Sequence, residues 1–221
     1  CSITGPKTCE GKPCGDGDER FEGLCDKDGC DFNSYRLGAK DFYGNGAGYT
    51  VDSSKPIQVV TQFHTVDGTD SGVLSKIERF YVQGGKVIEN SHSAVSGVSQ
   101  NSITDDFCRK QKSTFQDPDD FTDNGGMAQM GGALERGMVL ALSLWDDEAL
   151  HMRWLDSLHI GPNKTESTPG VRRGPCQLGE GHPKNVRSKY PDAGVRFSKI
   201  SVGEIGSTFS HSRRLAAGVF V

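Results

Sequence analysis

The chain has 221 residues, a length that suits one all-β domain or a large part of one. Its net charge of −4 at pH 7 and the lack of a basic stripe argue against a nucleic-acid-binding surface. No stretch reaches about 18 consecutive apolar residues, so we predict no membrane-spanning segment. The 29 glycines, roughly double the usual share of about 7%, indicate many turns between short strands.

Cysteine usage gives the clearest information on compartment. Five of the seven cysteines fall among glycine, aspartate and lysine in the first 30 residues, which indicates a loop region held by disulfides. A zinc site would need paired C-x2-C clusters or histidines at ligand spacing, whereas the close spacings here are C-x4-C, so we predict no metal. The sequon Asn163-Lys164-Thr165 predicts N-glycosylation at Asn163. We therefore expect an extracellular, secreted protein.

Two features of the cysteines and the N-terminus leave alternatives open. The chain starts at Cys1 rather than Met, which we interpret as a processed or truncated end. An odd number of cysteines leaves one thiol unpaired, and Cys176 lies farthest from the others along the chain. Cys176 is therefore either a free buried cysteine or the partner of a cysteine upstream of residue 1.

The predicted elements begin after a loop-dominated stretch at 1–48. Residues 57–66 are β-branched and aromatic with partial alternation, which predicts a half-buried strand. Residues 77–89 predict a hairpin around Gly84-Gly85, because two glycines form a favoured tight turn between strands.

The second half of the chain predicts fewer regular elements. Residues 90–136 are polar and predict loops, apart from a short helix near 105–111. The apolar run at 137–147 covers both faces of a strand, although periodicity alone also allows a buried helix. After a long loop at 157–192, the alternation at 195–202 changes phase and predicts a strand with a bulge. Several strands, long loops and almost no amphipathic helix predict an all-β sandwich.

The residues alone reveal no complete catalytic site. Four aspartates at 117–123 resemble a calcium loop, but their register fails, so we interpret them as a solvated acidic loop. Asp146 and Glu148 would share a strand face, as paired glycosidase carboxylates can, although acidic strand ends are common. Trp145 and Trp154 are either core residues or flat platforms for the apolar face of a sugar.

A resemblance to a known family rests on motifs that occur in order along the chain. The run Cys25-Asp-Lys-Asp-Gly-Cys30-Asp-Phe-Asn-Ser-Tyr-Arg-Leu-Gly38, followed by Asp41-Phe-Tyr-Gly44, resembles the CDxDGCDxNxYRxG…FYG signature of glycoside hydrolase family 7. Further matching segments are Val59–Phe63, Gly137–Asp147, Met152–Ser157, Ser167–Gly174 and Val195–Ser207. The resemblance covers residues 1–207, which we interpret as the C-terminal part of the family's catalytic domain, with a disordered tail at 208–221.

The resemblance implies a concanavalin A-like β-sandwich, or jelly roll, with long disulfide-stapled loops over a cleft. The family's retaining enzymes use an E-x-D-x-x-E motif that supplies the nucleophile and the general acid and base. No glutamate in this chain has an aspartate two residues later. We therefore expect the catalytic carboxylates upstream of residue 1, an incomplete sandwich, and an isolated chain that is inactive and aggregates. Asp146 and Glu148 then drop out as the catalytic pair.

Other functional residues carry over from the family one at a time. Trp145 resembles the glucosyl platform on the substrate side of the cleavage point, and Trp154 resembles the platform on the leaving-group side. A charged cluster resembles the family's grip on released cellobiose, and charge-assisted hydrogen bonds suit that task. Its members are Arg20, Asp28, Asp31 and Arg173, with Arg36 nearby in a more structural role.

The resemblance also implies a disulfide pattern and two departures. The implied disulfides are Cys1–Cys25, Cys9–Cys14 and Cys30–Cys108, with Cys176 bonded to the missing half. The loop between Cys14 and Cys25 is shorter than in typical cellobiohydrolases, and Glu148 and Ala149 stand where tyrosines often cover the cleft. Both departures indicate a more open cleft roof.

These observations lead us to predict a secreted cellulase that hydrolyses β-1,4-glucosidic bonds with retention. We expect a cellobiohydrolase, monomeric when full length, that binds cellulose or cello-oligosaccharide chains without a cofactor, nucleic acid or membrane. Loop material at 9–24, 146–153 and 158–173 favours this choice, because endoglucanases of the family usually lack much of it. The alternatives are an endo-β-1,4-glucanase of the same family and a non-catalytic, lectin-like glucan-binding protein.

Overall fold

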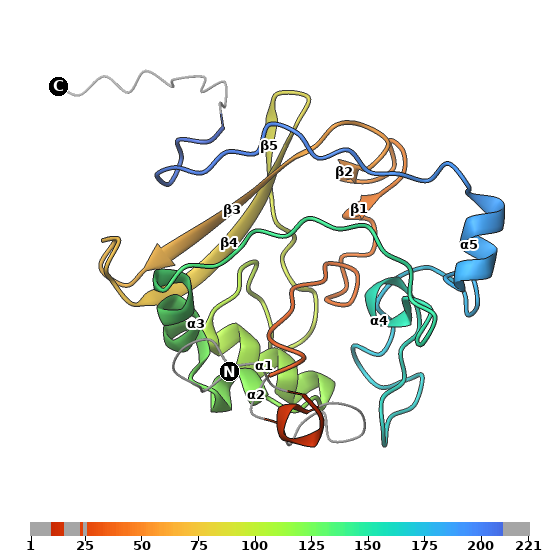
Figure 1. The fold of residues 1–221 in the computed structure, drawn as a ribbon, viewed down its shortest axis with the longest axis horizontal. Helices are drawn as coiled ribbons and strands as arrows, with labels where there is room; N and C mark the ends of the chain where they lie inside the picture. The colour runs from red at the N-terminus through yellow and green to blue at the C-terminus, as the bar shows by residue number, and fades with distance from the viewer. Residues whose placement is uncertain (1–9, 16–22, 24–25, 210–221) are drawn as a thin grey trace.

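A computed structural model describes residues 10–15, 23 and 26–209 of the chain (Figure 1). Its central feature is a three-stranded antiparallel sheet in the order β3-β4-β5. These strands are β3 (Gln58–Thr65), β4 (Leu74–Gln83) and β5 (Lys86–Glu89). A small parallel pair, β1 (Tyr43–Gly44) and β2 (Val51–Asp52), lies outside that sheet, and a short 3-10 helix η1 spans Lys12–Cys14. No helix in the described ranges has the length and apolar character to cross a membrane.

The central hairpin confirms two predictions from the sequence. The strand predicted at 57–66 is β3, and the hairpin predicted at 77–89 is formed by the end of β4 together with β5. Gly84 and Gly85 both adopt positive φ, 57° and 76°, which the tight turn between the two strands requires and which glycine adopts without strain. The register that follows places Val82 opposite Val87.

Helices make up more of the chain than the sequence predicted. The helix predicted near 105–111 is α1 (Asp105–Phe115), where the Thr104 side chain accepts a hydrogen bond from the Phe107 amide at 3.1 Å and caps the first turn. Four further helices occupy segments predicted as loops or left without a prediction. They are α2 (Asp120–Asp123), α3 (Gly126–Glu135), α4 (Arg153–Asp156) and α5 (Pro183–Lys189).

The prediction of loops over 90–136 was therefore wrong at α2 and α3, and the physical reason is visible in α3. Glycine lowers intrinsic helix propensity, and α3 contains several glycines. One of them, Gly131, lies so close to β4 that a Cβ there would stand 2.7 Å from the Cβ of Leu74. Packing against the sheet stabilises a helix that its composition does not favour. The loop predicted at 157–192 was likewise wrong where α5 begins, with Pro183 at its first position.

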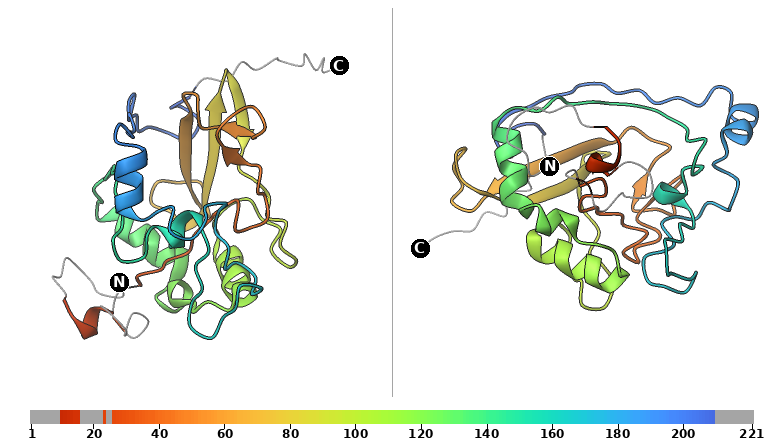
Figure 2. Two further views of the ribbon diagram at one scale, coloured as in Figure 1. Left: turned by 90° about the vertical axis from the view of Figure 1, so that its right-hand side faces the viewer. Right: turned by 60° about the horizontal axis from the view of Figure 1, so that its bottom comes forward.

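The core lies between α1 and the loops that precede and follow the sheet in the chain. Its buried members are Leu37, Val98, Phe107, Cys108 and Phe115. Phe32 stacks on Phe107 with ring centroids 5.2 Å apart. Helices α1, α2 and α3 follow one another beside one end of the sheet, as both views in Figure 2 show.

The strands predicted at 137–147 and 195–202 are not present in the structure. Both segments run as long extended traces past the sheet without forming a ladder with any other described strand (Figures 1 and 2). Val139 and Val202 are 93% and 94% exposed. The alternative of a buried helix at 137–147 was also wrong. A strand needs a neighbour for its backbone hydrogen bonds, and no described segment supplies one here.

Candidate functional site

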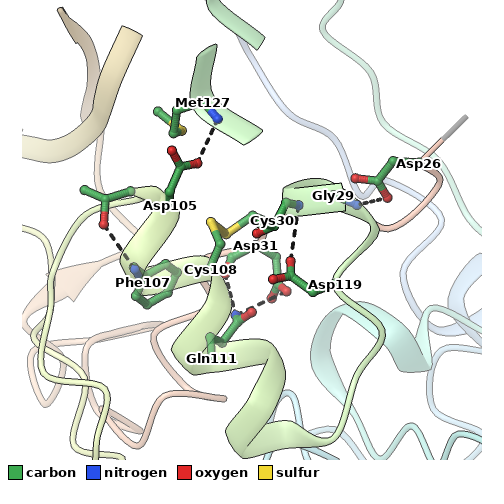
Figure 3. The surroundings of a disulfide bond; sticks show 12 residues. Asp26, Gly29, Cys30, Asp31, Asp105, Phe107, Cys108, Gln111, Asp119 and Met127 are labelled. Carbon is green, nitrogen blue, oxygen red and sulfur yellow. Dashed lines mark hydrogen bonds between the residues drawn. A yellow bond between two sulfur atoms is a disulfide. The ribbon is translucent and has the colours of Figure 1, made fainter. Parts of the chain in front are cut away.

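A tight loop before the core carries the acidic residues of the predicted cluster. The Asp26 carboxylate accepts hydrogen bonds from the amides of Asp28 (3.0 Å) and Gly29 (2.7 Å), which forms an Asx turn. The next residue, Cys30, forms a disulfide with Cys108 of α1, with Cα atoms 5.7 Å apart. This loop is therefore fixed to α1 directly after Gly29 (Figure 3).

A second tie between the loop and α1 positions Asp31. Gln111 of α1 is fully buried, and its Nε2 donates to the backbone oxygen of Asp31 at 2.6 Å and to its carboxylate at 3.3 Å. Figure 3 shows the Gln111 amide pointing at Asp31 from below the disulfide. The Asp31 carboxylate also accepts a hydrogen bond from Arg36 at 3.0 Å.

Arg36 connects three parts of the chain. Its side chain is only 2% exposed and its Nη atoms bind the carboxylates of Asp31 and Asp117. Its Nε donates to the backbone oxygen of Gly170 at 2.8 Å, and its guanidinium lies 4.3 Å from the ring centroid of Phe115. Because every face of this guanidinium has a partner, Arg36 organises the cluster rather than offering donors to a ligand.

Arg173 is the member of the cluster with donor capacity to spare. Its backbone is held by the Asn33 side chain, which donates to the Arg173 oxygen at 3.0 Å, and by its own amide, which donates to Ser157 at 2.8 Å. Burial and the nearby Arg36 charge lower the pKa of Arg173, against the opposing carboxylates of the cluster. Its Nε is buried without a hydrogen-bond acceptor among the described residues. Such a donor gains from a ligand oxygen, because an unpaired buried donor costs free energy.

The two tryptophans form one aromatic surface. The ring centroids of Trp145 and Trp154 lie 5.7 Å apart at an interplanar angle of 47°. Trp145 is 61% exposed, and the Trp154 indole nitrogen donates to the Asp147 carboxylate at 3.2 Å. Asp147 also accepts the amide of Leu150 at 3.1 Å, so it fixes the turn that brings the second ring beside the first.

Comparison with known proteins decides the family. The sequence profile described as Glycosyl hydrolase family 7 matches residues 1–209. The chain belongs to glycosyl hydrolase family 7. Family 7 enzymes have a β-sandwich fold, so the predicted sandwich holds at the level of the family, while the described residues of this chain contain its hairpin and connecting loops rather than two large sheets.

Solved family 7 structures match at high identity but over part of their length. A cellobiohydrolase from Daphnia pulex is 49% identical with a TM-score of 0.78, over 82% of this chain and 41% of that one. The Humicola insolens endocellulase is 41% identical with a TM-score of 0.70, over 86% and 41% of the two chains. A Melanocarpus albomyces cellobiohydrolase in complex with cellotetraose is 36% identical with a TM-score of 0.68, over 80% and 38%. The chain thus spans about two fifths of these family 7 proteins.

The structure brings together most of the residues that the family resemblance singled out. Asp31, Arg36 and Arg173 lie in one cluster, and the Asp28 carboxylate is close enough to influence the pKa of Arg173. Arg20 lies outside the described residues. Asp146 and Glu148, rejected as a catalytic pair, both face Arg187 of α5, with N–O distances of 2.8 and 3.7 Å.

The predicted disulfides have different outcomes. The structure contains Cys30–Cys108, and Cys14 is disulfide-bonded as well. Cys1, Cys9 and Cys25 lie outside the described residues, so the pairs Cys1–Cys25 and Cys9–Cys14 stay predictions. Cys176 carries a thiol, and burial followed by the neighbouring Asp156 carboxylate raises its pKa to about 11. Its proposed bond to a cysteine outside this chain stays a prediction too.

Sequence reasoning missed several residues that build the site. Gln111 fell inside a predicted helix but carried no motif, and Lys164 was read only as the middle of the glycosylation sequon. Asn163 itself is exposed and has a left-handed backbone with φ of 57°. Asp117, interpreted as part of a solvated acidic loop, instead binds both Arg36 and Lys164. No local pattern could have revealed these contacts, because the partners are 47 to 81 residues apart.

Proposed function

We propose that this protein is a secreted cellulase that hydrolyses β-1,4-glucosidic bonds with retention, and specifically a cellobiohydrolase that releases cellobiose. Retention in glycosidases requires two carboxyl groups about 5–5.5 Å apart, one acting as nucleophile and the other as acid and then base. We place both in sequence that lies upstream of residue 1. The residues of this chain would bind the sugar rather than cleave it, so the 221-residue chain alone should not hydrolyse cellulose.

The observation that carries the proposal is the buried Arg173 Nε, which has no acceptor among the described residues and lies near enough to the carboxylates of the cluster for them to influence the pKa of Arg173. Asp31 is held by Gln111 and Arg36, so its remaining lone pairs point in a set direction. Arg173 supplies a buried N–H without an acceptor among the described residues. A sugar hydroxyl both donates and accepts, so one hydroxyl can bind a carboxylate and a guanidinium together. We infer that a glucosyl unit of the product occupies this position.

The aromatic surface of Trp145 and Trp154 supports the same proposal. An exposed indole can pack against the apolar face of a pyranose, and carboxylates beside it can accept hydrogen bonds from the hydroxyl groups of the sugar. Asp147 already holds the Trp154 ring in place through the indole nitrogen. A structure of an endoglucanase in complex with cellobiose and the cellotetraose complex are among the similar structures, and we propose the same class of ligand here.

An endo-acting enzyme is the second candidate, and specific residues favour it. Glu148 and Ala149 are both exposed, and they stand where tyrosines often cover the cleft in the family. Glutamate is charged and alanine is short, so neither replaces a tyrosine ring. The Humicola insolens endocellulase matches this chain at 41% identity. A more open roof would allow binding in the middle of a glucan chain, and the two activities differ in their products.

The test uses the protein expressed from its complete coding sequence. We expect soluble cellobiose as the main product from crystalline cellulose, released first as the β-anomer, with slow loss of viscosity of a soluble cellulose derivative. Rapid loss of viscosity with little cellobiose would establish the endoglucanase instead. Binding of glucan without any hydrolysis would establish the lectin-like alternative.

A substitution separates the sugar grip from overall folding. Arg173→Met should weaken cellobiose binding by roughly 10- to 100-fold, the effect of losing a charge-assisted hydrogen bond. The matched control is Arg109→Met, which removes an exposed arginine of α1. Equal cellobiose affinity in the two variants would remove Arg173 from the binding site.

A further inference from the structure

The segment at 160–170 is a loop whose two ends meet at a short backbone bridge. Leu158 and Arg172 form an isolated antiparallel bridge. On either side of it, the His159 amide donates to Val171 at 3.0 Å and the Arg173 amide donates to Ser157 at 2.8 Å. Arg173 is therefore part of the base of this loop, and any movement of the base moves the sugar-binding arginine.

The returning end of the loop is anchored on the end of α1. Gly170 has a left-handed backbone with φ of 75°, and a Cβ there would stand 2.5 Å from the ring of Phe115. Its backbone oxygen accepts the hydrogen bond from Arg36 Nε at 2.8 Å. Only glycine allows this close approach. The contact holds Gly170, which lies three residues before Arg173, against the buried ring of Phe115.

The tip of the loop is anchored by an ion pair that is largely removed from water. Lys164 binds the Asp117 carboxylate, and the two side chains are only 11% and 16% exposed. Burial would raise the pKa of Asp117, but the Lys164 hydrogen bond and the Arg36 charge outweigh it and lower the pKa below its ordinary value. The pair therefore stays charged in mildly acidic solution, and breaking it by removing one partner leaves a buried charge unpaired.

Asp117 joins the two anchors. One of its oxygens binds Lys164 and the other binds Arg36, whose second Nη binds Asp31. The chain of contacts runs from the loop tip through Asp117 and Arg36 to a carboxylate of the sugar-binding cluster. Loss of the contact at the loop tip should therefore alter the site in two ways. It should shift Arg173 through the loop backbone, and it should shift Asp31 through Arg36.

We propose that Lys164 and Asp117 are positioning residues, which fasten the loop at 160–170 and thereby hold Arg173 and Asp31 in the geometry that binds a glucosyl unit. The inference rests on the proposed function, because it takes this cluster to be the cellobiose-binding site. It adds two residues from outside the cluster that set the affinity of that site without touching the sugar.

The experiment measures cellobiose affinity by calorimetry in the protein expressed from its complete coding sequence. Lys164→Met keeps most of the side-chain length but removes the charge, and it should weaken binding on the order of tenfold, as should Asp117→Asn. Lys164→Arg keeps the charge and should restore most of the affinity. A control, Lys110→Met, breaks the exposed Lys110–Asp106 pair on α1 and should leave cellobiose binding unchanged.

Hydrogen exchange supplies a readout that does not depend on the sugar. In Lys164→Met, amide exchange should accelerate at 160–173 and remain unchanged in β3 and β4. Unchanged affinity and unchanged exchange in Lys164→Met would overturn the positioning role while leaving the proposed function intact. Failure of the unsubstituted protein to bind cellobiose would overturn the proposed function and with it the role of the loop. Equal losses in Lys164→Met and Lys164→Arg would also contradict the ion pair as the cause.

Discussion

His159 shows how the charged cluster acts on a single titratable residue. The imidazole lies at the base of the loop at 160–170 and is half-buried near three arginines. Burial lowers its pKa first, and the charges of Arg173, Arg153 and Arg36 lower it further, with Asp28 opposing them weakly. The folded protein therefore keeps this histidine neutral at a pH where an unfolded chain would already protonate it.

The first prediction concerns the pH dependence of stability that follows from His159. Between its lowered pKa and the ordinary value of 6.5, the unfolded chain binds more protons at this position than the folded chain. The free energy of unfolding should consequently fall as pH decreases through that window. In the protein expressed from its complete coding sequence, His159→Gln, which does not titrate, should show a smaller decrease between pH 7 and pH 5 in urea unfolding.

An NMR titration provides the direct measurement of the same residue. The imidazole resonances of His159 should titrate below pH 6.5, the ordinary value for histidine. A pKa of His159 at or above its ordinary value would contradict the electrostatic description of the cluster, since burial and three arginines all act in the same direction.

At the scale of elements, the Cys30–Cys108 disulfide is the strongest constraint between α1 and the loop that carries Asp28 and Asp31. It closes a stretch with a sequence separation of 78 residues, and the entropy of such a loop in the unfolded chain corresponds to about 4 kcal/mol. Cys108 is fully buried and belongs to the same core cluster as Phe107 and Leu37. The bond therefore joins the two segments that provide Asp31 and Gln111.

We predict that Cys30→Ser combined with Cys108→Ser lowers the free energy of unfolding by about 4 kcal/mol, measured by denaturant unfolding. Because Asp28 and Asp31 flank Cys30, cellobiose affinity should fall in the same variant. Arg109→Met removes an exposed side chain of α1 and serves as the comparison. A loss of stability no larger than that of Arg109→Met would show that the hydrogen bonds of Gln111 suffice to hold the loop.

The elements that the sequence predicted correctly are those with local signals. The strand β3 follows from β-branched alternation and the hairpin from two consecutive glycines. The helix predicted near 105–111 is present as α1, and the structure shows that Thr104 caps it. Helix α3 has no such local signal. Its glycine at 131 is explained only by the close approach to Leu74 on β4. Local patterns report on propensity, whereas a contact between distant segments overrides propensity without leaving a pattern nearby.

The same reason limits what the sequence shows of the site. Asp31 and Arg173 are 142 positions apart, and no common motif joins them with Arg36. Only the family resemblance placed the three residues together. The contact of Lys164 with Asp117 lies outside the family motifs, so neither resemblance nor periodicity indicated it. A charged residue in a polar loop looks the same in sequence whether it faces solvent or a buried partner.

At the scale of the whole molecule, the segments at 137–147 and 195–202 have the apolar pattern of strands but do not form strands. Their composition fits a sheet interior, yet the described residues offer no neighbour for their backbone groups. Met138, Leu140 and Leu144 are exposed together on one stretch. Such a surface is unusual for a soluble protein unless another segment covers it.

The last prediction follows from these exposed segments. The similar solved proteins are more than twice as long as the matched region, and we expect the rest of the family domain to pair with 137–147 and 195–202. The isolated 221-residue chain should then be cut rapidly by protease within both segments and should aggregate, because unpaired strand edges recruit other chains. In the protein from the complete coding sequence, the same segments should resist cleavage and exchange their amides slowly. An isolated chain that stays soluble, melts cooperatively and resists protease at 137–147 would show that these segments are stable as extended, unpaired structure.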